Sequence, residues 1–95
     1  MKVELSAEAA AQIERIDAWW RVNRQAAPGL FAEELERALL ALAENPALGV
    51  RYPPKPSVRR LLLARTHHHL YVVEEQSRVY VVAVWSAYRG QGPRL

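Results

Sequence analysis

The spacing of hydrophobic residues changes about halfway along this chain of 95 residues. Residues 3–5 alternate apolar and polar side chains, which predicts a short opening strand. From there to residue 44 the apolar positions recur every three or four residues, the period of an α-helix. After residue 57 they form nearly continuous runs, typical of strands that are covered on both faces. The pattern predicts a single α+β domain over residues 1–95.

Two helices are predicted before residue 45. The first runs from an N-cap at Ser6 to about residue 23, and the second from Pro28 to a stop at Asn45-Pro46. Their short connection favours an antiparallel helical hairpin. Trp19 and Trp20 cannot face the same way, so one ring is expected to be exposed or covered by a partner. The expected core positions are Ala9, Ile13, Ile16, Trp20, Phe31, Leu35, Ala38, Leu39 and Leu42.

Three strands are predicted in the second half, at residues 58–65, 69–74 and 78–85, with a hairpin turn at 75–77. Residues 45–57 hold four of the six prolines and are expected to form an irregular loop, as is the tail from residue 87. The expected fold is an N-terminal strand, a helical hairpin on one face of a mainly antiparallel sheet, and three C-terminal strands (β-α-α-β-β-β). The pattern leaves open what covers the other face.

Composition adds an asymmetry of charge. The net charge is +3, but residues 1–48 carry five Lys/Arg against eight Asp/Glu, whereas residues 49–95 carry eight against two. Such a basic half predicts an anionic partner, either nucleic acid or an acidic protein segment; the alternative is an ordinary solvated surface. The chain has no cysteine, no recognisable signal peptide and no apolar run long enough to span a membrane, so a cytoplasmic protein without membrane contact is expected.

The arginines of the predicted strands are the first candidate site. Guanidinium groups bind phosphate or carboxylate oxygens bidentately, so together they can form an anion-binding surface. Arg59 and Arg60 point to opposite faces of a strand, and Arg65 shares the side of Arg59 if that strand is regular. The alternative is cross-strand pairing with Glu74 and Glu75. The arginines concerned are Arg59, Arg60, Arg65, Arg78 and Arg89.

Three consecutive histidines, His67-His68-His69, raise the question of a metal site. In a strand His67 and His69 share one face and His68 points to the other. Two imidazoles with no Asp, Glu or Cys nearby in sequence make an incomplete ligand set, so no metal and no cofactor are predicted. Half-exposed histidines at a strand edge are expected, with a general acid–base role as the alternative.

The exit of the last predicted strand carries Trp85, Tyr88 and Arg89. Trp85 is expected in the core. Tyr88 and Arg89 are expected to contact a partner, because aromatic and arginine side chains are enriched in interfaces and also stack on bases. The sequence has no glycine-rich phosphate loop, Gly-x-Ser-x-Gly or His-Glu-x-x-His motif, so conventional hydrolase chemistry is not supported.

The order of these segments resembles the RelE/ParE superfamily, the toxins of bacterial type II toxin–antitoxin (plasmid stabilisation) systems. The resemblance covers nearly the whole chain. It implies a cognate antitoxin that covers exposed apolar surface of the toxin, with operator DNA contacted only through that antitoxin. The segments that carry it are Leu5-Ser6-x-x-Ala9, Asn45-Pro46-x-x-Gly49, Val58-Arg59-Arg60-Leu61, Leu70-Tyr71-Val72, Val82-Ala83-Val84-Trp85 and Arg89-Gly90-Gln91-Gly92-Pro93.

The resemblance implies one of two activities. ParE-like members bind and inhibit DNA gyrase, whereas RelE-like members are endoribonucleases that cut messenger RNA on the ribosome. RelE-like nucleases are rich in lysine and arginine at their site, often with a histidine or tyrosine near the last strand, but here the only lysines are Lys2 and Lys55. In addition, Ser86 stands where many relatives have histidine, and His68 where an aromatic residue is usual.

These departures favour the ParE-like branch, which needs no catalytic set. The residues expected to bind the target or a partner are Arg59, Arg60, Arg65, Trp85, Tyr88 and Arg89. In the RelE-like alternative the catalytic candidates are Arg60, Arg65, His69, Tyr88 and Arg89. A non-catalytic nucleic-acid-binding module is the third possibility.

Overall fold

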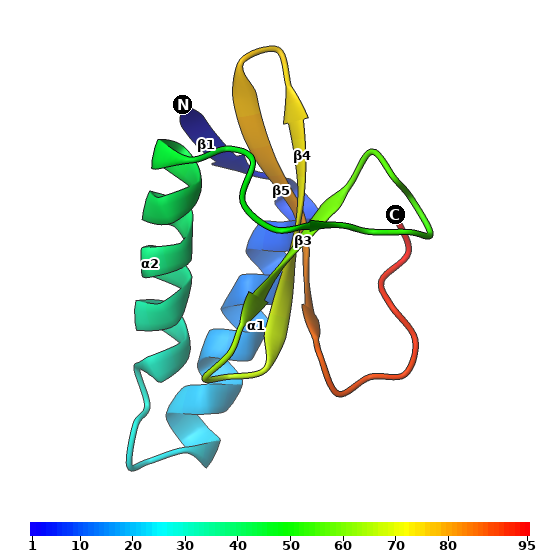
Figure 1. The fold of residues 1–95 in the computed structure, drawn as a ribbon. Helices are drawn as coiled ribbons and strands as arrows, with labels where there is room; N and C mark the ends of the chain where they lie inside the picture. Colours follow the sequence, from blue (N-terminus) through cyan, green and yellow to red (C-terminus); the bar gives the residue numbers. More distant parts are fainter.

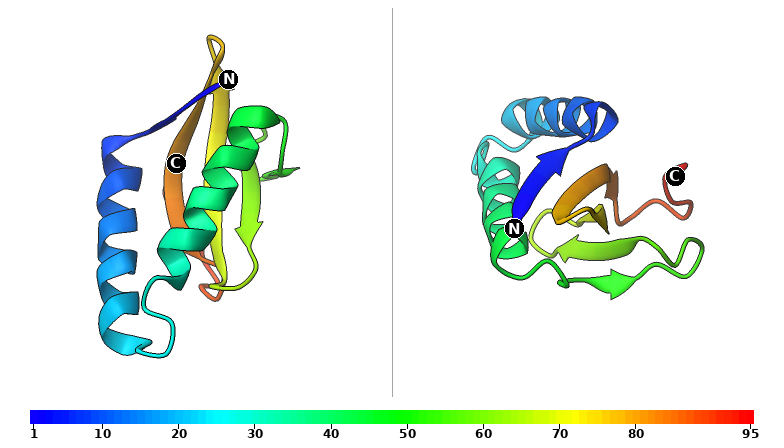
Figure 2. Two further views of the ribbon diagram at one scale, coloured as in Figure 1. Left: turned by 90° about the vertical axis from the view of Figure 1, so that its left-hand side faces the viewer. Right: turned by 90° about the horizontal axis from the view of Figure 1, so that it is seen from above.

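The computed structural model describes residues 1–95 and shows two helices on one side of a five-stranded sheet (Figures 1 and 2). The strands lie in the order β1-β5-β4-β3-β2; β1 is parallel to β5, and the other neighbours are antiparallel. The predicted α+β architecture is confirmed. The elements in chain order are β1 (Lys2–Leu5), α1 (Ala7–Asn23), α2 (Leu30–Glu44), β2 (Val50–Arg51), β3 (Arg59–Leu63), β4 (His68–Glu75) and β5 (Arg78–Ser86).

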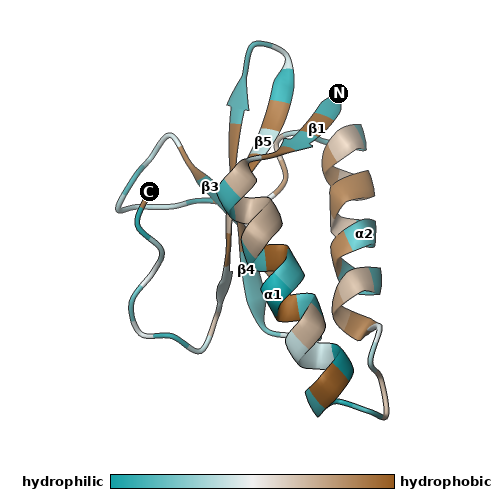
Figure 3. Ribbon diagram, turned by 180° about the vertical axis from the view of Figure 1, so that it is seen from behind, coloured by the Kyte–Doolittle hydropathy of each residue, from teal (hydrophilic) through white to brown (hydrophobic).

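The two helices form the predicted antiparallel hairpin, and bands of hydrophilic and hydrophobic residues alternate along both (Figures 2 and 3). The Ser6 hydroxyl caps α1 by accepting a hydrogen bond from the Ala9 N–H at 3.0 Å. Every predicted core position of the helices belongs to the main core cluster or packs against it. The second helix begins at Leu30, after Gly29 in the cap position, and not at Pro28. Neither helix combines the length and the apolar character that a membrane span requires.

Helix α1 and its cap residue also supply hydrogen-bond partners to the part of β5 that has no strand beside it. Strand β1 lies beside only the first half of β5, as far as Val81. Beyond that point the Ser6 N–H donates to the Val81 carbonyl at 3.0 Å, and the Val84 N–H donates to Oε1 of Gln12 at 2.7 Å. Gln12 is only 6% exposed, so this amide group sits within the core stripe of α1. The buried N–H of β5 is thereby satisfied by a side chain instead of by a strand.

We predict that Gln12→Met lowers the free energy of unfolding by about 1–3 kcal/mol, because it leaves the buried Val84 N–H without an acceptor. Methionine fills a similar volume, so lost packing contributes little. Urea denaturation followed by far-UV circular dichroism measures the change. Substitution of the exposed Gln76 by Met is the control and should leave the midpoint nearly unchanged. An unchanged midpoint for Gln12→Met would show that this bond does not hold α1 to the sheet.

The face of the sheet opposite the helices, here called the far face, is covered by the chain itself. A second core cluster forms there around Val58, Tyr71 and Ala83, with Tyr52 and Trp85 packed against it. The residue 52–58 loop and the C-terminal tail both lie on this side (Figures 1 and 2). The Trp85 Nε1–H donates to the Gln91 carbonyl at 2.8 Å and so holds the tail against β5. The central part of this face is thus covered without a partner chain.

The segment 45–57 is not wholly irregular, because β2 pairs with the start of β3. The turn into β2 depends on Gly49, whose φ is 95°, in the left-handed region that favours glycine. A Cβ at this position would lie 2.9 Å from the carbonyl oxygen of Arg60. The Asn45-Pro46-x-x-Gly49 segment therefore brings the backbone close enough to β3 to add a fifth strand.

The predicted turn between the last two strands is confirmed and is tight. Strand β4 ends at Glu75 and β5 begins at Arg78, so Gln76 and Ser77 make the whole connection. Both have positive φ, at 50° and 63°. Two consecutive positive values are the geometry of a type I′ turn, which matches the twist of the strands but normally uses Asn-Gly.

We predict that replacing Gln76-Ser77 by Asn-Gly stabilises the protein by about 1 kcal/mol, because both residues tolerate positive φ. For a domain of this size the melting temperature should rise by roughly 4–8 °C. The matched control, Ser77→Ala, keeps the unfavourable φ and should give no rise. Equal melting temperatures for all variants would mean that the turn is not strained.

Candidate partner-binding site

The structure does not gather the predicted arginines on one surface. Arg59 lies on the helix side of β3 and donates to the Gly49 carbonyl at 3.4 Å. Arg78 pairs with Glu4 of β1 at 3.3 Å, so the alternative of cross-strand pairing with Glu74 or Glu75 is wrong for this residue. Arg65 lies in the turn after β3 and not in the strand, so its predicted alignment with Arg59 is also wrong. Only Arg60 and Arg89 remain candidates for the far face.

Arg60 and Arg89 each lie over an aromatic ring on the far face. The Arg60 guanidinium is 5.5 Å from the Tyr52 ring centre, and the Arg89 guanidinium is 4.5 Å from the Trp85 ring centre. His69 is the cross-strand neighbour of Trp85. Burial, and then the charge of Arg60, lower the pKa of His69. These four residues, Arg60, His69, Trp85 and Arg89, are called the far-face row below.

The three histidines occupy three different environments. His67 lies in the turn before β4 with φ 60°, and its ring centre is 4.8 Å from that of the exposed Tyr88. His68 faces the helices, with its ring 5.2 Å from Phe31. His69 faces the other way, next to Tyr71 at 6.2 Å. The predicted convergence of His67 and His69 is therefore wrong, because His67 is not in a strand.

The turn between β3 and β4 is fastened to helix α2 by one carboxylate, which the sequence reading missed. Glu34 accepts hydrogen bonds from the Arg65 N–H at 2.7 Å, the Thr66 N–H at 3.0 Å and the Thr66 hydroxyl at 2.7 Å. Thr66 is only 5% exposed. These three bonds fasten the turn to α2, next to the start of β4.

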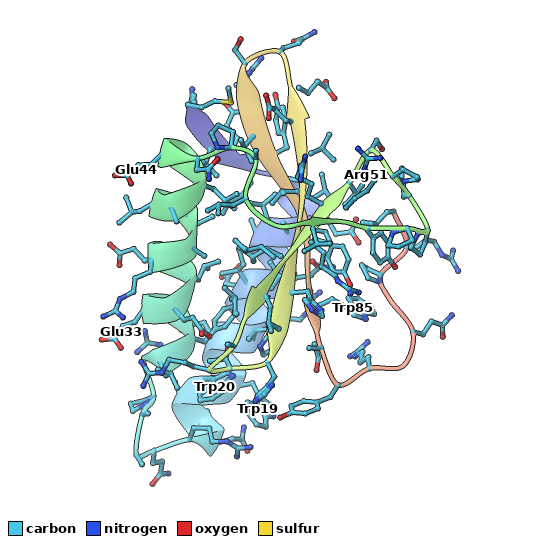
Figure 4. The ribbon with its side chains drawn as sticks, in the orientation of Figure 1. Trp19, Trp20, Glu33, Glu44, Arg51 and Trp85 are labelled. Carbon is cyan, nitrogen blue, oxygen red and sulfur yellow. The ribbon has the colours of Figure 1, made fainter.

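A groove lies between the second half of α1, this turn and the end of β5. Its volume is about 510 Å³. Trp19 and Trp20 line it from the helix, and Trp85 lines it from the strand (Figure 4). This arginine–tryptophan groove is lined by Gln12, Arg15, Ile16, Trp19, Trp20, Arg24, Thr66, His68, Val84, Trp85, Ser86, Tyr88 and Arg89.

The groove is aromatic inside and positively charged at its rim. The Arg24 guanidinium lies 4.8 Å from the Trp19 ring centre and 5.8 Å from that of Trp20. The two rings are packed edge to face, 6.1 Å apart, and Trp19 is 48% exposed. Arg15 and Arg89 complete the rim, and none of the lining residues is an aspartate or glutamate.

The sequence reading identified only part of this groove. Trp85, Tyr88 and Arg89 were expected to contact a partner or fill the core, and Trp19 was expected to be exposed or covered. Arg15 and Arg24 were missed. Residues 12, 15, 16 and 19 recur at helical spacing as a stripe beside the core stripe of α1, and this second stripe was the available signal.

His68 also lines the groove, where its surroundings disfavour a charged imidazole. Its Nδ1 atom is buried and has no hydrogen-bond partner. Burial is the main cause that lowers the pKa of this imidazole. The unfolded chain, with a histidine pKa near 6.5, therefore binds protons more readily than the folded chain in mildly acidic solution.

We predict that the free energy of unfolding decreases as the pH falls below about 6.5, because the unfolded state then takes up protons that the folded state excludes. Urea midpoints at pH 7.5 and 5.5 measure the effect. His68→Gln should reduce the difference between the two midpoints. The difference that remains is expected to come from His69, whose pKa is also lowered by burial. A midpoint independent of pH in the unaltered protein would contradict the assignment.

Comparison with known proteins gives two positive findings. The sequence model of the family described as "ParE toxin of type II toxin-antitoxin system, parDE" matches residues 3–89. Among solved structures, the chain is similar to one of a chromosomal ParDE TA system from P. aeruginosa, with a TM-score of 0.69 and 16% sequence identity. That match covers 90% of this chain and 95% of the other, and at this identity it shows the fold. No curated protein sequence matches.

Proposed function

Since the chain belongs to the ParE toxin family of type II toxin–antitoxin systems, we propose that it inhibits DNA gyrase by binding and is neutralised by its cognate antitoxin. Membership of this family is the observation that supports the proposal. The match to the ParE toxin family spans residues 3–89, which include both helices and, apart from Lys2, all five strands. The predicted absence of a catalytic set is consistent with action by binding.

The placement of the nuclease candidates supports binding over catalysis. Cleavage of RNA needs one group to activate the 2′-hydroxyl, a second to protonate the leaving oxygen, and cations near the phosphate. Arg60 and His69 are neighbours on the far face, but Tyr88 stacks on His67 and is 76% exposed. Arg65 lies in the turn that Glu34 holds. Of the nuclease candidates, the far face therefore holds one imidazole, His69, and no second proton-transfer group.

The far-face row is the surface that we assign to the gyrase target. Arg60 is exposed, and its charge is not paired with a carboxylate. Trp85 and Arg89 lie along the same face, and tryptophan and arginine are the residues that most often dominate binding energy. Arg59, Arg65 and Tyr88, which the sequence also suggested as contacts, lie outside this row.

The test is a gyrase supercoiling assay with purified protein. We expect inhibition, and we expect Arg60→Glu to raise the half-inhibitory concentration by about tenfold or more, as loss of one interfacial charge contact does. Arg37→Glu, an equal change of charge on the outer side of α2, should inhibit like the unaltered protein. Circular dichroism should show that both variants are folded.

A protein that leaves supercoiling untouched but cuts ribosome-bound messenger RNA would replace this proposal by the RelE-like one. In that case substitution of Arg65, His69 and Tyr88 should abolish cleavage. Steep salt-dependent binding of the isolated chain to DNA or RNA, without either activity, would favour the plain nucleic-acid-binding alternative.

A further inference from the structure

We infer that the hairpin formed by β2, the residue 52–58 loop and the start of β3 contacts the phosphate backbone of the duplex DNA that gyrase holds. Residues 50–59 are called the basic hairpin below. The inference rests on the proposed function, because it adds the DNA of the enzyme–DNA complex as a second contact of the same protein. It concerns an edge of the sheet that belongs neither to the far-face row nor to the arginine–tryptophan groove.

The basic hairpin carries positive charge that nothing in the chain neutralises. It contains Arg51, Lys55 and Arg59 and no acidic residue, and the stretch without aspartate or glutamate runs from residue 45 to residue 73. None of the three side chains forms an ion pair with a carboxylate. Arg59 donates only to the Gly49 carbonyl, at 3.4 Å. All three positive charges are therefore available to an anionic ligand.

The pairing of β2 with β3 places two of these charges side by side. Arg51 and Arg59 are directly opposite each other across the two strands. Residues in this relation share one face of the sheet, and like charges there repel each other. Both side chains line a cleft of about 260 Å³ at the β2 edge. An anion bound between two guanidinium groups removes this repulsion and accepts hydrogen bonds from both, so the register favours a ligand with charged oxygens.

The hairpin has a fixed shape before any ligand binds. Val58 is 1% exposed and anchors the end of the loop in the second core cluster. The Tyr52 N–H donates to the Val58 carbonyl at 2.8 Å, and the Val58 N–H donates to the Lys55 carbonyl at 2.9 Å. Three residues of the loop are prolines, which restrict the backbone further. Such a preorganised loop loses little conformational entropy when its charges meet a ligand.

The cleft suits a phosphate better than a peptide. Its lining has no aromatic residue, and Val72, its one aliphatic residue other than proline, is only 2% exposed. A peptide would therefore find no apolar pocket for an anchoring side chain, on which protein interfaces usually depend. Glu74 also lines the cleft, but it belongs to β4, on the opposite side of β3 from Arg51. The outermost charged residue of the cleft is thus a cation.

The basic hairpin adjoins the surface proposed for gyrase. Arg60 of the far-face row follows Arg59 in β3 and is the cross-strand neighbour of Val50. The loop of the hairpin extends outward from the sheet (Figure 1). An enzyme bound at the far-face row would therefore lie next to the hairpin and bring its DNA close to Lys55. Phosphate contacts position a protein on DNA without reading the base sequence, so this contact requires no particular sequence.

The experiment compares gyrase with and without DNA. The full chain is titrated by biolayer interferometry into purified gyrase alone and into gyrase loaded with a linear duplex, at several salt concentrations. We expect tighter binding to the loaded enzyme. Arg51→Gln/Lys55→Gln should lower that affinity roughly tenfold and leave the affinity for gyrase alone unchanged. The logarithmic dependence of affinity on salt should become less steep by about 2, because two phosphate contacts are lost.

Two further variants make the comparison specific. Arg37→Glu produces the same change of net charge on the outer side of α2 and should bind both forms of gyrase like the unaltered protein. Lys55→Gln alone changes one exposed side chain and should give about half of the change in salt dependence. This single variant keeps the test decisive if the double variant does not fold.

Three outcomes would overturn the inference. Binding of Arg51→Gln/Lys55→Gln to loaded gyrase with the affinity of the unaltered protein would show that the hairpin takes no part. An equal loss of affinity with and without DNA would mean that the hairpin contacts the protein surface of gyrase. Binding of the isolated chain to single-stranded RNA but not to the duplex, abolished in the double variant, would identify an RNA site.

Failure of the proposed target is distinguishable from failure of this inference. If the unaltered protein does not bind gyrase, the same variants are compared for binding of the isolated chain to the duplex at low salt by fluorescence anisotropy. Weaker binding of the double variant than of Arg37→Glu would retain the hairpin as a DNA contact and reject gyrase as the target. Equal binding by the two variants, or no binding by the unaltered protein, would reject both.

Discussion

The second half of β5 has no strand beside it, and the way in which α1 compensates determines much of this molecule. Strand β1 ends its pairing at Val81, yet β5 continues to Ser86. A bare edge of this kind leaves buried backbone groups unpaired and offers a template for other chains. Ser6 and Gln12 supply the missing partners from the first turns of α1, so the helix runs along the edge of β5 and not over the middle of the sheet.

That placement creates the arginine–tryptophan groove. Because α1 follows the edge of β5, its last turns extend to the level of the β3–β4 turn, which Glu34 of α2 holds in place. Arg15, Trp19 and Arg24 of the helix then line the groove together with Trp85 and Arg89, and Gln12, which also lines it, joins α1 to β5 through its bond with Val84. The groove is the part of the α1–β5 junction that the protein does not fill by itself.

The two faces of the sheet are covered by different means, and this explains why the charge of the second half does not form a single platform. The helices cover one face, and the residue 52–58 loop and the tail cover the centre of the other. The basic residues are left at the margins: Arg60 over Tyr52, Arg89 over Trp85 and Arg78 beside β1. The far-face row and the arginine–tryptophan groove lie at two such margins, and both include Trp85.

The sequence by itself determined the helices, the order of the main strands along the chain, the Ser6 cap and the place of the last hairpin turn, because hydrophobic period and capping residues act within a few positions along the chain. It also singled out Trp85, Tyr88 and Arg89. It did not determine β2, the direction of the three histidines, the partner of Arg78, or the roles of Gln12 and Glu34. The roles of Gln12 and Glu34 and the partner of Arg78 depend on contacts between residues 31 to 74 positions apart, such as Glu34 with Arg65 and Arg78 with Glu4. Only the tertiary structure decides them, because a hydrogen bond or ion pair between distant residues depends on how the elements pack, and the local spacing of residues carries no record of that packing.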